Sequence, residues 1–143
     1  MRKWLLVLVL ASSASAQAPS PPSTEDKLVA DPNTAKFTPI TLPGFAPGAE
    51  GAPIGVDPST KGPTGYAKFP AKYRIPPHWH SYAEYVTVIS GKSTLTLDGK
   101  PHDLAPGSYV VIPAKTTHEL TCGASTCLVI SRRAGPADYN WVK

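Results

Sequence analysis

Three histidines and one glutamate have the residue types and spacing of a metal site. His78 and His80 precede a run rich in β-branched residues, and on an extended strand residues i and i+2 point to the same face. Glu84 has the same parity four residues on, and His118 follows in a second segment. Imidazoles combined with a carboxylate bind divalent cations such as Mn, Fe, Ni, Cu and Zn. We therefore expect these four side chains to hold one divalent transition metal.

Simpler interpretations stand beside this one. A lone histidine on a strand is more often an ordinary hydrogen-bonded residue than a ligand. His102, the fourth histidine of the chain, lies outside the pattern beside a hairpin turn, and we expect it on the surface. A weaker alternative is a metal-free structural barrel, in which the four ligand residues match by chance.

The first segment resembles a motif of the cupins, a family of small β-barrels. That motif is G-x5-H-x-H-x3,4-E-x6-G. His78, His80, Glu84 and Gly91 match its spacing, while Lys72 stands at the leading glycine position. The resemblance implies that the histidines and the glutamate are metal ligands.

The second segment resembles the other cupin motif, G-x5-P-x-G-x2-H-x3-N. Gly107, Pro113 and His118 match it, while Lys115 replaces the inner glycine and Cys122 the final asparagine. The departures fall on turn or packing positions rather than on ligand positions. The resemblance covers about residues 65 to 133 and implies a cupin-type double-stranded β-helix, the jelly-roll barrel.

The strand pattern independently favours an all-β fold, because many short strands at close spacing are typical of barrels and sandwiches. We expect the segment 109–112 to be a buried strand and the last two strands to form a hairpin around residues 123–126. The tail 132–143 is expected to pack as an edge strand or, alternatively, to cover a partner's sheet. The expected strands span residues 37–42, 52–56, 66–75, 82–90, 93–97, 100–104, 109–112, 118–122 and 127–132.

The first 16 residues are typical of a secretory signal peptide, with a basic start, a short apolar run at 4–11 and a small-residue cleavage site. We expect a secreted or periplasmic protein with no membrane anchor after cleavage. Residues 17–35, rich in Pro, Ser and Ala, predict a flexible leader, and residues 36–143 a single barrel domain. Cleavage lowers the net charge from +4 to +2, because Arg2 and Lys3 are removed without any acid. With no basic run, we do not expect a nucleic-acid partner.

The two cysteines, Cys122 and Cys127, favour a disulfide in an exported protein. A cross-strand bridge fits the expected hairpin. The alternative, Cys122 as a thiolate ligand, is disfavoured by distance, because four residues of strand separate it from His118 by about 13 Å.

On an ion that accepts five or six ligands, four protein ligands leave an open position, which is the arrangement of a catalytic metal. Tyr82 has the parity of the ligands and is expected either to face the cavity as a substrate-binding residue or to be ordinary core. Trp79 and Tyr85 have the opposite parity and are expected to face outward or into a dimer interface. No catalytic residue beyond the ligands can be assigned.

Ligands and compartment favour copper or manganese, with iron, nickel and zinc as alternatives. The resulting hypothesis is a secreted metal-dependent oxidoreductase of the oxygenase or oxidase type. Its substrate would be a small organic molecule or carbohydrate, with copper-dependent attack on extracellular polysaccharide as one form. The alternatives are a non-catalytic metal- or ligand-binding protein and an isomerase. The resemblance to cupins also implies a homodimer.

Overall fold

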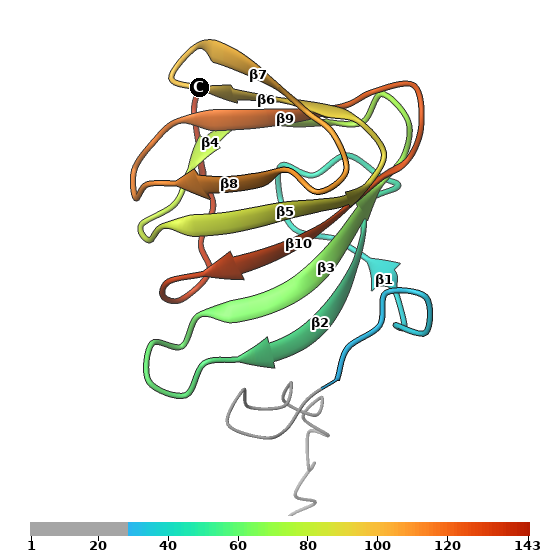
Figure 1. The fold of residues 1–143 in the computed structure, drawn as a ribbon. Helices are drawn as coiled ribbons and strands as arrows, with labels where there is room; N and C mark the ends of the chain where they lie inside the picture. Colours follow the sequence, from blue (N-terminus) through green and yellow to red (C-terminus); the bar gives the residue numbers. More distant parts are fainter. Residues whose placement is uncertain (1–28) are drawn as a thin grey trace, which may run out of the picture.

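The structure is a computed structural model that describes residues 29–143 (Figure 1). The signal peptide expected at 1–16 and most of the leader expected at 17–35 lie outside the described residues. The strands are β1 (Thr38–Pro39), β2 (Glu50–Val56), β3 (Pro63–Phe69), β4 (Arg74–Trp79), β5 (Glu84–Ser90), β6 (Ser93–Leu97), β7 (Lys100–Leu104), β8 (Tyr109–Ile112), β9 (His118–Cys122), β10 (Cys127–Arg133) and β11 (Asn140–Trp141).

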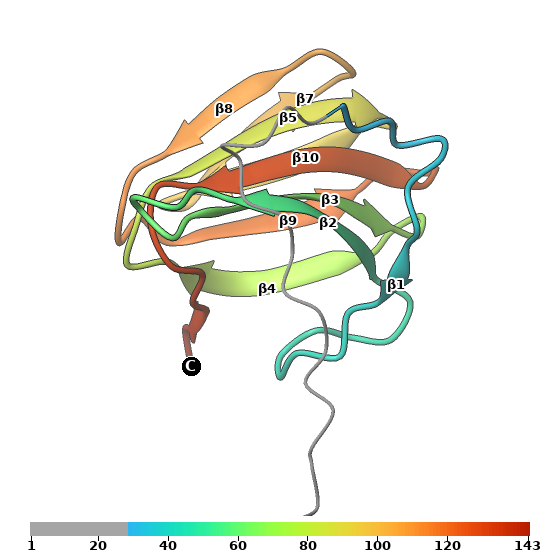
Figure 2. The same cartoon turned by 90° about the horizontal axis from the view of Figure 1, so that it is seen from below.

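These strands form two antiparallel sheets. One has the order β1-β2-β3-β10-β5-β8 and the other the order β11-β4-β9-β6-β7. The chain passes from one sheet to the other at most connections from β3 onward, with β6 and β7 forming a hairpin within one sheet. Figures 1 and 2 show the sheets curving around a shared interior. The predicted all-β jelly-roll is therefore confirmed.

Alternating burial along the strands builds the core between the sheets. In β5, Val86 and Val88 are buried while Thr87 and Ile89 are only partly so, as the period of two residues requires. Inward side chains of the other sheet, such as Leu95 and Leu120, meet them. The resulting apolar interior forms the walls of the candidate site.

The expected hairpin of the last two long strands is wrong. β9 pairs with β4 and β6 in one sheet, whereas β10 pairs with β3 and β5 in the other. Cys122 and Cys127 are nevertheless joined by a disulfide, with their Cα atoms 5.8 Å apart. The bond ties the two sheets together at one end of the barrel, and it leaves Cys122 unavailable as a thiolate ligand.

The segment 109–112 is an edge strand rather than a buried one. β8 pairs only with β5, and Tyr109 and Val111 are exposed while Ile112 is buried. The segment reads as uniformly apolar, so its sequence cannot distinguish an edge from a central strand. In contrast, the tail does pack back on its own barrel, where β11 pairs with β4.

Both lysines that replace cupin glycines have left-handed backbone conformations. Lys72 has φ 61° and Lys115 has φ 63°. The turns that the motif builds with glycine are therefore kept. The amide of Lys115 donates to the carbonyl of His80 at 2.8 Å, which ties the turn to the metal-site segment.

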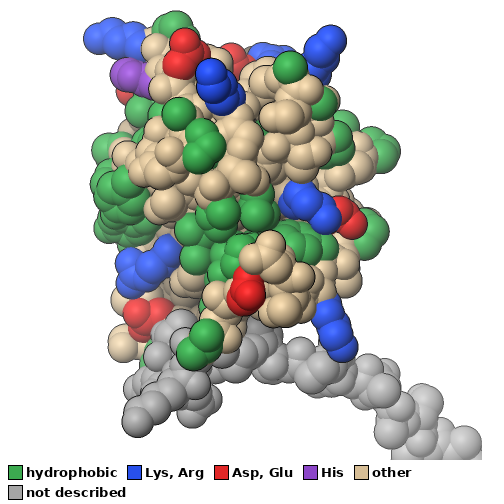
Figure 3. Space-filling model, turned by 45° about the vertical axis from the view of Figure 1, so that its right-hand side comes forward, with side chains coloured by type: hydrophobic (Ala, Val, Ile, Leu, Met, Phe, Trp, Pro, Cys, Tyr) green, Lys and Arg blue, Asp and Glu red, His purple; other side chains and the backbone are tan. Residues whose placement is uncertain are grey.

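Within residues 29–143 no helix has the length and apolar character needed to cross a membrane. On the face shown in Figure 3, basic and acidic side chains are scattered among hydrophobic ones and form no patch of one sign.

Candidate metal centre

The site lies between the two sheets at one end of the barrel. His78 on β4 faces His118 on β9, its partner in the strand register, and His80 follows directly after β4. Glu84 begins β5 in the opposite sheet, across from Arg133 at the end of β10. Two sheets thus contribute two kinds of group, with imidazoles on one side and an ion pair on the other.

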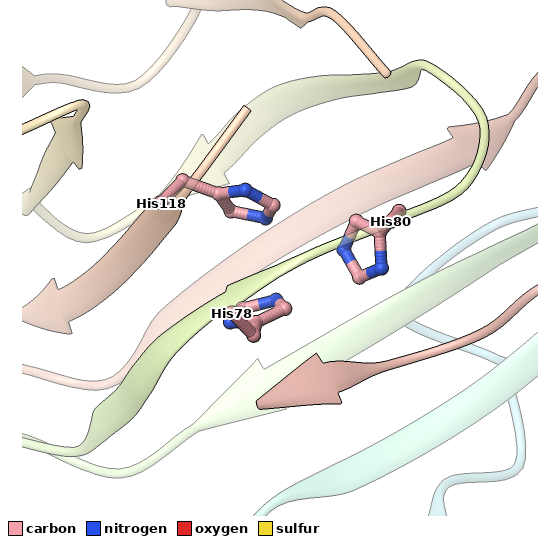
Figure 4. Close-up of side chains that lie close together, drawn as sticks. All are labelled: His78, His80 and His118. Carbon is pink, nitrogen blue, oxygen red and sulfur yellow. The ribbon is translucent and has the colours of Figure 1, made fainter. Parts of the chain in front are cut away.

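The three imidazoles point toward one common space (Figure 4). Their ring centroids lie 4.2 Å apart for His78 and His118, 4.8 Å for His78 and His80, and 4.9 Å for His80 and His118. One nitrogen from each ring lies within 4.8 Å of the others. All three residues are between 2% and 4% exposed, so the cluster is shielded from bulk water.

Backbone carbonyls define the tautomer of every ring. Nδ1 of His78 lies 2.7 Å from the carbonyl of Pro76, and Nδ1 of His118 lies 2.9 Å from that of Thr116. Nδ1 of His80 lies 2.5 Å from the carbonyl of Asp138. A carbonyl oxygen can only accept, so each Nδ1 carries the proton. In the neutral ring each Nε2 then presents a lone pair, which is the state of a metal-binding imidazole.

Glu84 approaches the cluster from the other sheet. Its Oε2 lies 3.3 Å from Nε2 of His80 and 3.5 Å from Nε2 of His118. The same oxygen lies 2.9 Å from Nη1 of Arg133, and Ser131 donates to Oε1 at 2.6 Å. Burial raises the pKa of Glu84, but the nearby charge of Arg133 holds it well below its usual value. The carboxylate is therefore ionised.

In this arrangement the lone pairs of two Nε2 atoms face the lone pairs of the Glu84 carboxylate. The Nε2 atoms of His80 and His118 are buried without a hydrogen-bond partner among the described residues. In the neutral rings, with Nδ1 protonated, these nitrogens cannot donate to the Glu84 carboxylate that faces them. Buried polar atoms left unpaired are costly, and a cation between them would satisfy all of them at once. The three histidines can thus hold a metal ion, with Glu84 placed to join them.

His78 resists protonation. Burial, and then the charge that His118 carries when protonated, lowers the pKa of His78 to about 4, although its bond to Pro76 opposes the shift. The imidazole is therefore neutral in weak acid and does not require deprotonation before it binds a metal.

Aromatic side chains of the C-terminal segment cover the cluster. The ring of Tyr139 lies 5.4 Å from that of His78 and 5.0 Å from that of His80. Trp141 stacks on Tyr139 and lies 5.1 Å from His78. Gly44 lies against Trp141 so closely that a Cβ at this position would overlap the indole. Tyr139 and Trp141 are thus packed between the histidines on one side and Gly44 on the other.

Below this cover lies a cavity of about 90 Å³. Its polar wall contains the site residues, and the rest is apolar core. The polar lining consists of His78, Glu84, His118, Ser131, Arg133 and Tyr139. The arrangement can hold a metal beside a small, mostly dry compartment.

Tyr82 does not face this cavity. It is 45% exposed, and its ring lies against Gly135, which has no Cβ to obstruct it. The parity argument fails because residues 81–83 form the connection between β4 and β5 rather than part of one strand. Glu84 reaches the histidines from the opposite sheet for the same reason. His102, as expected, is exposed.

Sequence reasoning missed Ser131, Arg133 and Tyr139. The first two share a strand face by their spacing, and a buried-face arginine at the end of a strand was a usable signal. Tyr139 lies in the tail that was expected to form an edge strand, and the pairing of β11 with β4 brings it to the site.

Comparison with known proteins agrees with this fold. The family model described as the cupin domain matches residues 65–130. A solved structure of a cupin 2 conserved barrel domain protein from Rhodopseudomonas palustris superimposes with a TM-score of 0.66 at 15% identity, covering 77% of this chain and 79% of that one. Residues 65–130 therefore match the cupin domain, and the described chain has the fold of the cupin barrels.

Two further similarities concern proteins named for a reaction. Over 59 residues the chain is 30% identical to dimethylsulfoniopropionate lyase DddW of Ruegeria pomeroyi, a match that spans 41% of this chain and 39% of that protein. The polyketide cyclase RemF from Streptomyces resistomycificus superimposes with a TM-score of 0.68 at 18% identity, over 82% of this chain and 87% of that one. At such identity the second similarity concerns the fold alone.

Proposed function

We propose that the protein binds one divalent transition metal at His78, His80 and His118 and is a metal-dependent enzyme for a small organic molecule. One observation carries the proposal: three buried imidazoles each have Nδ1 occupied by a backbone carbonyl and direct Nε2 into one space. Glu84 is the proposed fourth ligand, because its Oε2 lies beside two of these nitrogens.

A metal bound here would supply a Lewis acid or a redox centre with an open coordination position. The protein's own groups do the rest. The imidazoles fix the position of the ion, and the Glu84 carboxylate offsets part of its charge. The apolar walls exclude water, which strengthens electrostatic interactions inside the cavity. The buried phenol of Tyr139 stands at the same wall as a group that can hold or give a proton.

The cavity limits the substrate. An engineered cavity of roughly 150 Å³ holds one benzene molecule, whereas this one measures about 90 Å³. It admits a very small molecule or the reacting end of a slightly larger one. Attack on a polysaccharide chain is therefore disfavoured, since the histidines are almost fully buried.

Two reaction classes suit the site. The first is oxidation by oxygen or peroxide, with copper or manganese as the favoured metal. The second is proton-transfer chemistry, such as elimination, cyclisation or isomerisation. Tyr139 favours the second class, because its hydroxyl group lies at the cavity wall, where it can exchange a proton with a bound molecule. The similarity to a protein named as a lyase points the same way.

Metal analysis of the tag-free protein tests the proposal. We expect one equivalent of a transition metal by elemental analysis, lost in a His78→Gln, His80→Gln double variant, with His102→Gln as the matched control. Turnover without oxygen would support proton-transfer chemistry, and turnover that requires oxygen would support the oxidoreductase. Tight metal binding without turnover on any small substrate would indicate the non-catalytic alternative. Absence of metal after reconstitution would refute the proposal.

We also propose that the protein is exported and acts as a homodimer. The signal-like residues 1–16 and the disulfide between Cys122 and Cys127 support export, because disulfides persist in oxidising compartments. The exposed edge strand β8, with Tyr109 and Val111 on its surface, supports self-association. Light scattering of the mature protein would show the mass of one chain if the dimer proposal is wrong.

A further inference from the structure

We infer that Arg133 and Tyr139 form a binding site for the carboxylate group of a small aliphatic acid, beside the metal. The inference deepens the proposed function by naming the substrate class, and it rests on the metal centre proposed there. Three features carry it: an incompletely paired buried guanidinium, a phenol with an unused proton, and the charge balance of the largely apolar cavity.

Arg133 is the buried cation of the cavity wall. The residue is 6% exposed and lines the cavity. Its Nη1 forms an ion pair with Oε2 of Glu84 at 2.9 Å, but it has no hydrogen-bond partner among the described residues. A guanidinium with N–H groups to spare matches the two oxygens of a carboxylate.

Tyr139 supplies a second donor next to the first. Its hydroxyl oxygen accepts from Nη2 of Arg133 at 3.3 Å, and the guanidinium lies 5.4 Å from the centre of its ring. Within residues 29–143 no acceptor is found for the phenol proton, although the residue lines the cavity. The proton is thus available to an oxygen of a ligand that also contacts Arg133.

The net charge of the metal-loaded cavity favours an anionic ligand. Glu84 and Arg133 neutralise each other, and the remaining lining of the cavity carries no further full charge once the histidines are neutral. A divalent metal then leaves a net charge of +2 in an enclosed, largely apolar space. Buried charge without compensation is costly. An anionic ligand reduces that charge, whereas a neutral ligand does not.

The remaining walls define the rest of the ligand. They are aliphatic and aromatic side chains of the core, including Val86, Leu95 and Leu120. A short hydrocarbon chain would contact them while its carboxylate meets Arg133 and Tyr139. Within about 90 Å³ only a few carbon atoms fit beside the carboxylate.

The test is calorimetric titration of the tag-free, metal-loaded protein with propionate and with propionamide, its uncharged counterpart of nearly equal size. We expect propionate to bind at least about tenfold more tightly, since hydrogen bonds to a charged group account for a factor of this size. Quenching of Trp141 fluorescence offers a second readout, because this residue stacks on Tyr139.

Two variants separate binding from folding. Arg133→Lys keeps the charge that Glu84 requires but loses the planar fork, and we expect it to weaken propionate binding by about tenfold. Tyr139→Phe keeps the aromatic cover and removes only the hydroxyl, and a loss of several-fold is expected. Tyr82→Phe, at an exposed position, is the matched control and should bind like the wild type.

Equal binding of propionate and propionamide, or propionate binding unchanged in both site variants, would overturn the inference. Metal content is measured in the same samples, so the two proposals fail separately. If the metal-loaded protein does not bind propionate, only the carboxylate site is refuted. If the protein takes up no metal after reconstitution but still binds propionate through Arg133, the metal centre is refuted and the carboxylate site is retained.

Discussion

Nδ1 of His80 donates to the backbone carbonyl of Asp138, at 2.5 Å and across 58 residues of sequence. The side chain of Asp138 in turn accepts from the amide and the hydroxyl of Ser81, so the tail is attached both at the histidine and at the residue that follows it. The C-terminal segment therefore orients one proposed metal ligand directly, in addition to covering the site with Tyr139 and Trp141.

Truncation after Gly135 should consequently weaken metal binding. The shortened chain lacks the acceptor for His80 and the aromatic cover, and loss of such supporting groups typically costs about 10- to 100-fold in metal affinity. Competition titration with a chelator measures the change. Removal of Lys143 alone is the control. Unchanged affinity in the truncated protein would show that His80 is held by other contacts.

Acid should destabilise the metal-free protein through His78. The unfolded chain binds a proton at His78 below its ordinary pKa of 6.5, but the folded chain does so only near 4. The stability contribution is thus complete above pH 6.5 and is lost as the pH falls toward 4, by up to about 3 kcal/mol. Urea unfolding at pH 7.0, 5.5 and 4.5 measures it. In His78→Gln the decline between pH 6.5 and 4.5 should be shallower, and an equally steep decline would contradict this assignment.

Lys115→Gly should stabilise the fold. Lys115 has φ 63°, a conformation that costs an L-residue about 1–2 kcal/mol, whereas glycine adopts it freely at an entropic cost of roughly 0.5–1 kcal/mol. A net gain of about 0.5–1 kcal/mol is expected from urea unfolding. Lys100→Gly, in the exposed strand β7 without a positive φ, should instead destabilise. A loss of stability in both variants would mean that contacts of the Lys115 side chain outweigh its backbone strain.

Removal of the disulfide should lower stability and leave metal binding intact. The bond closes a short loop between the sheets, for which chain entropy predicts about 2 kcal/mol. Cys122 and His118 lie at opposite ends of β9, so a Cys122→Ala, Cys127→Ala variant should unfold at lower urea concentration with unchanged metal affinity. A simultaneous loss of metal affinity would show that the disulfide between the sheets also positions β9.

The sequence predicted the proximity of the histidines better than it predicted the arrangement behind them. His78 in β4 and His80 directly after it lie together because alternate residues of an extended segment share a face, which is a local property of the chain. The expected hairpin around residues 123–126 failed because sheet membership depends on pairing with distant strands. Glu84 reached the site from the other sheet rather than along one strand, and Tyr82 was misplaced by the same error.

The opposite wall of the cavity depends on contacts that no local pattern contains. Arg133 meets Glu84 because β5 and β10 are neighbours, and Tyr139 meets His78 because the tail pairs with β4. Both contacts join segments more than 40 residues apart in sequence. The C-terminal segment contains the aromatic residues Tyr139 and Trp141, but the position of their rings depends on tertiary structure.

Every Nδ1 acceptor of the imidazole cluster belongs to the main chain, at Pro76, Thr116 and Asp138. A main-chain oxygen survives any side-chain substitution that leaves the backbone in place, so point mutations have few ways to turn these rings. The donors that face a ligand, on Arg133 and Tyr139, are side chains and can be replaced one at a time. In evolutionary terms, ligand preference can drift in such a protein while the imidazole cluster is inherited unchanged.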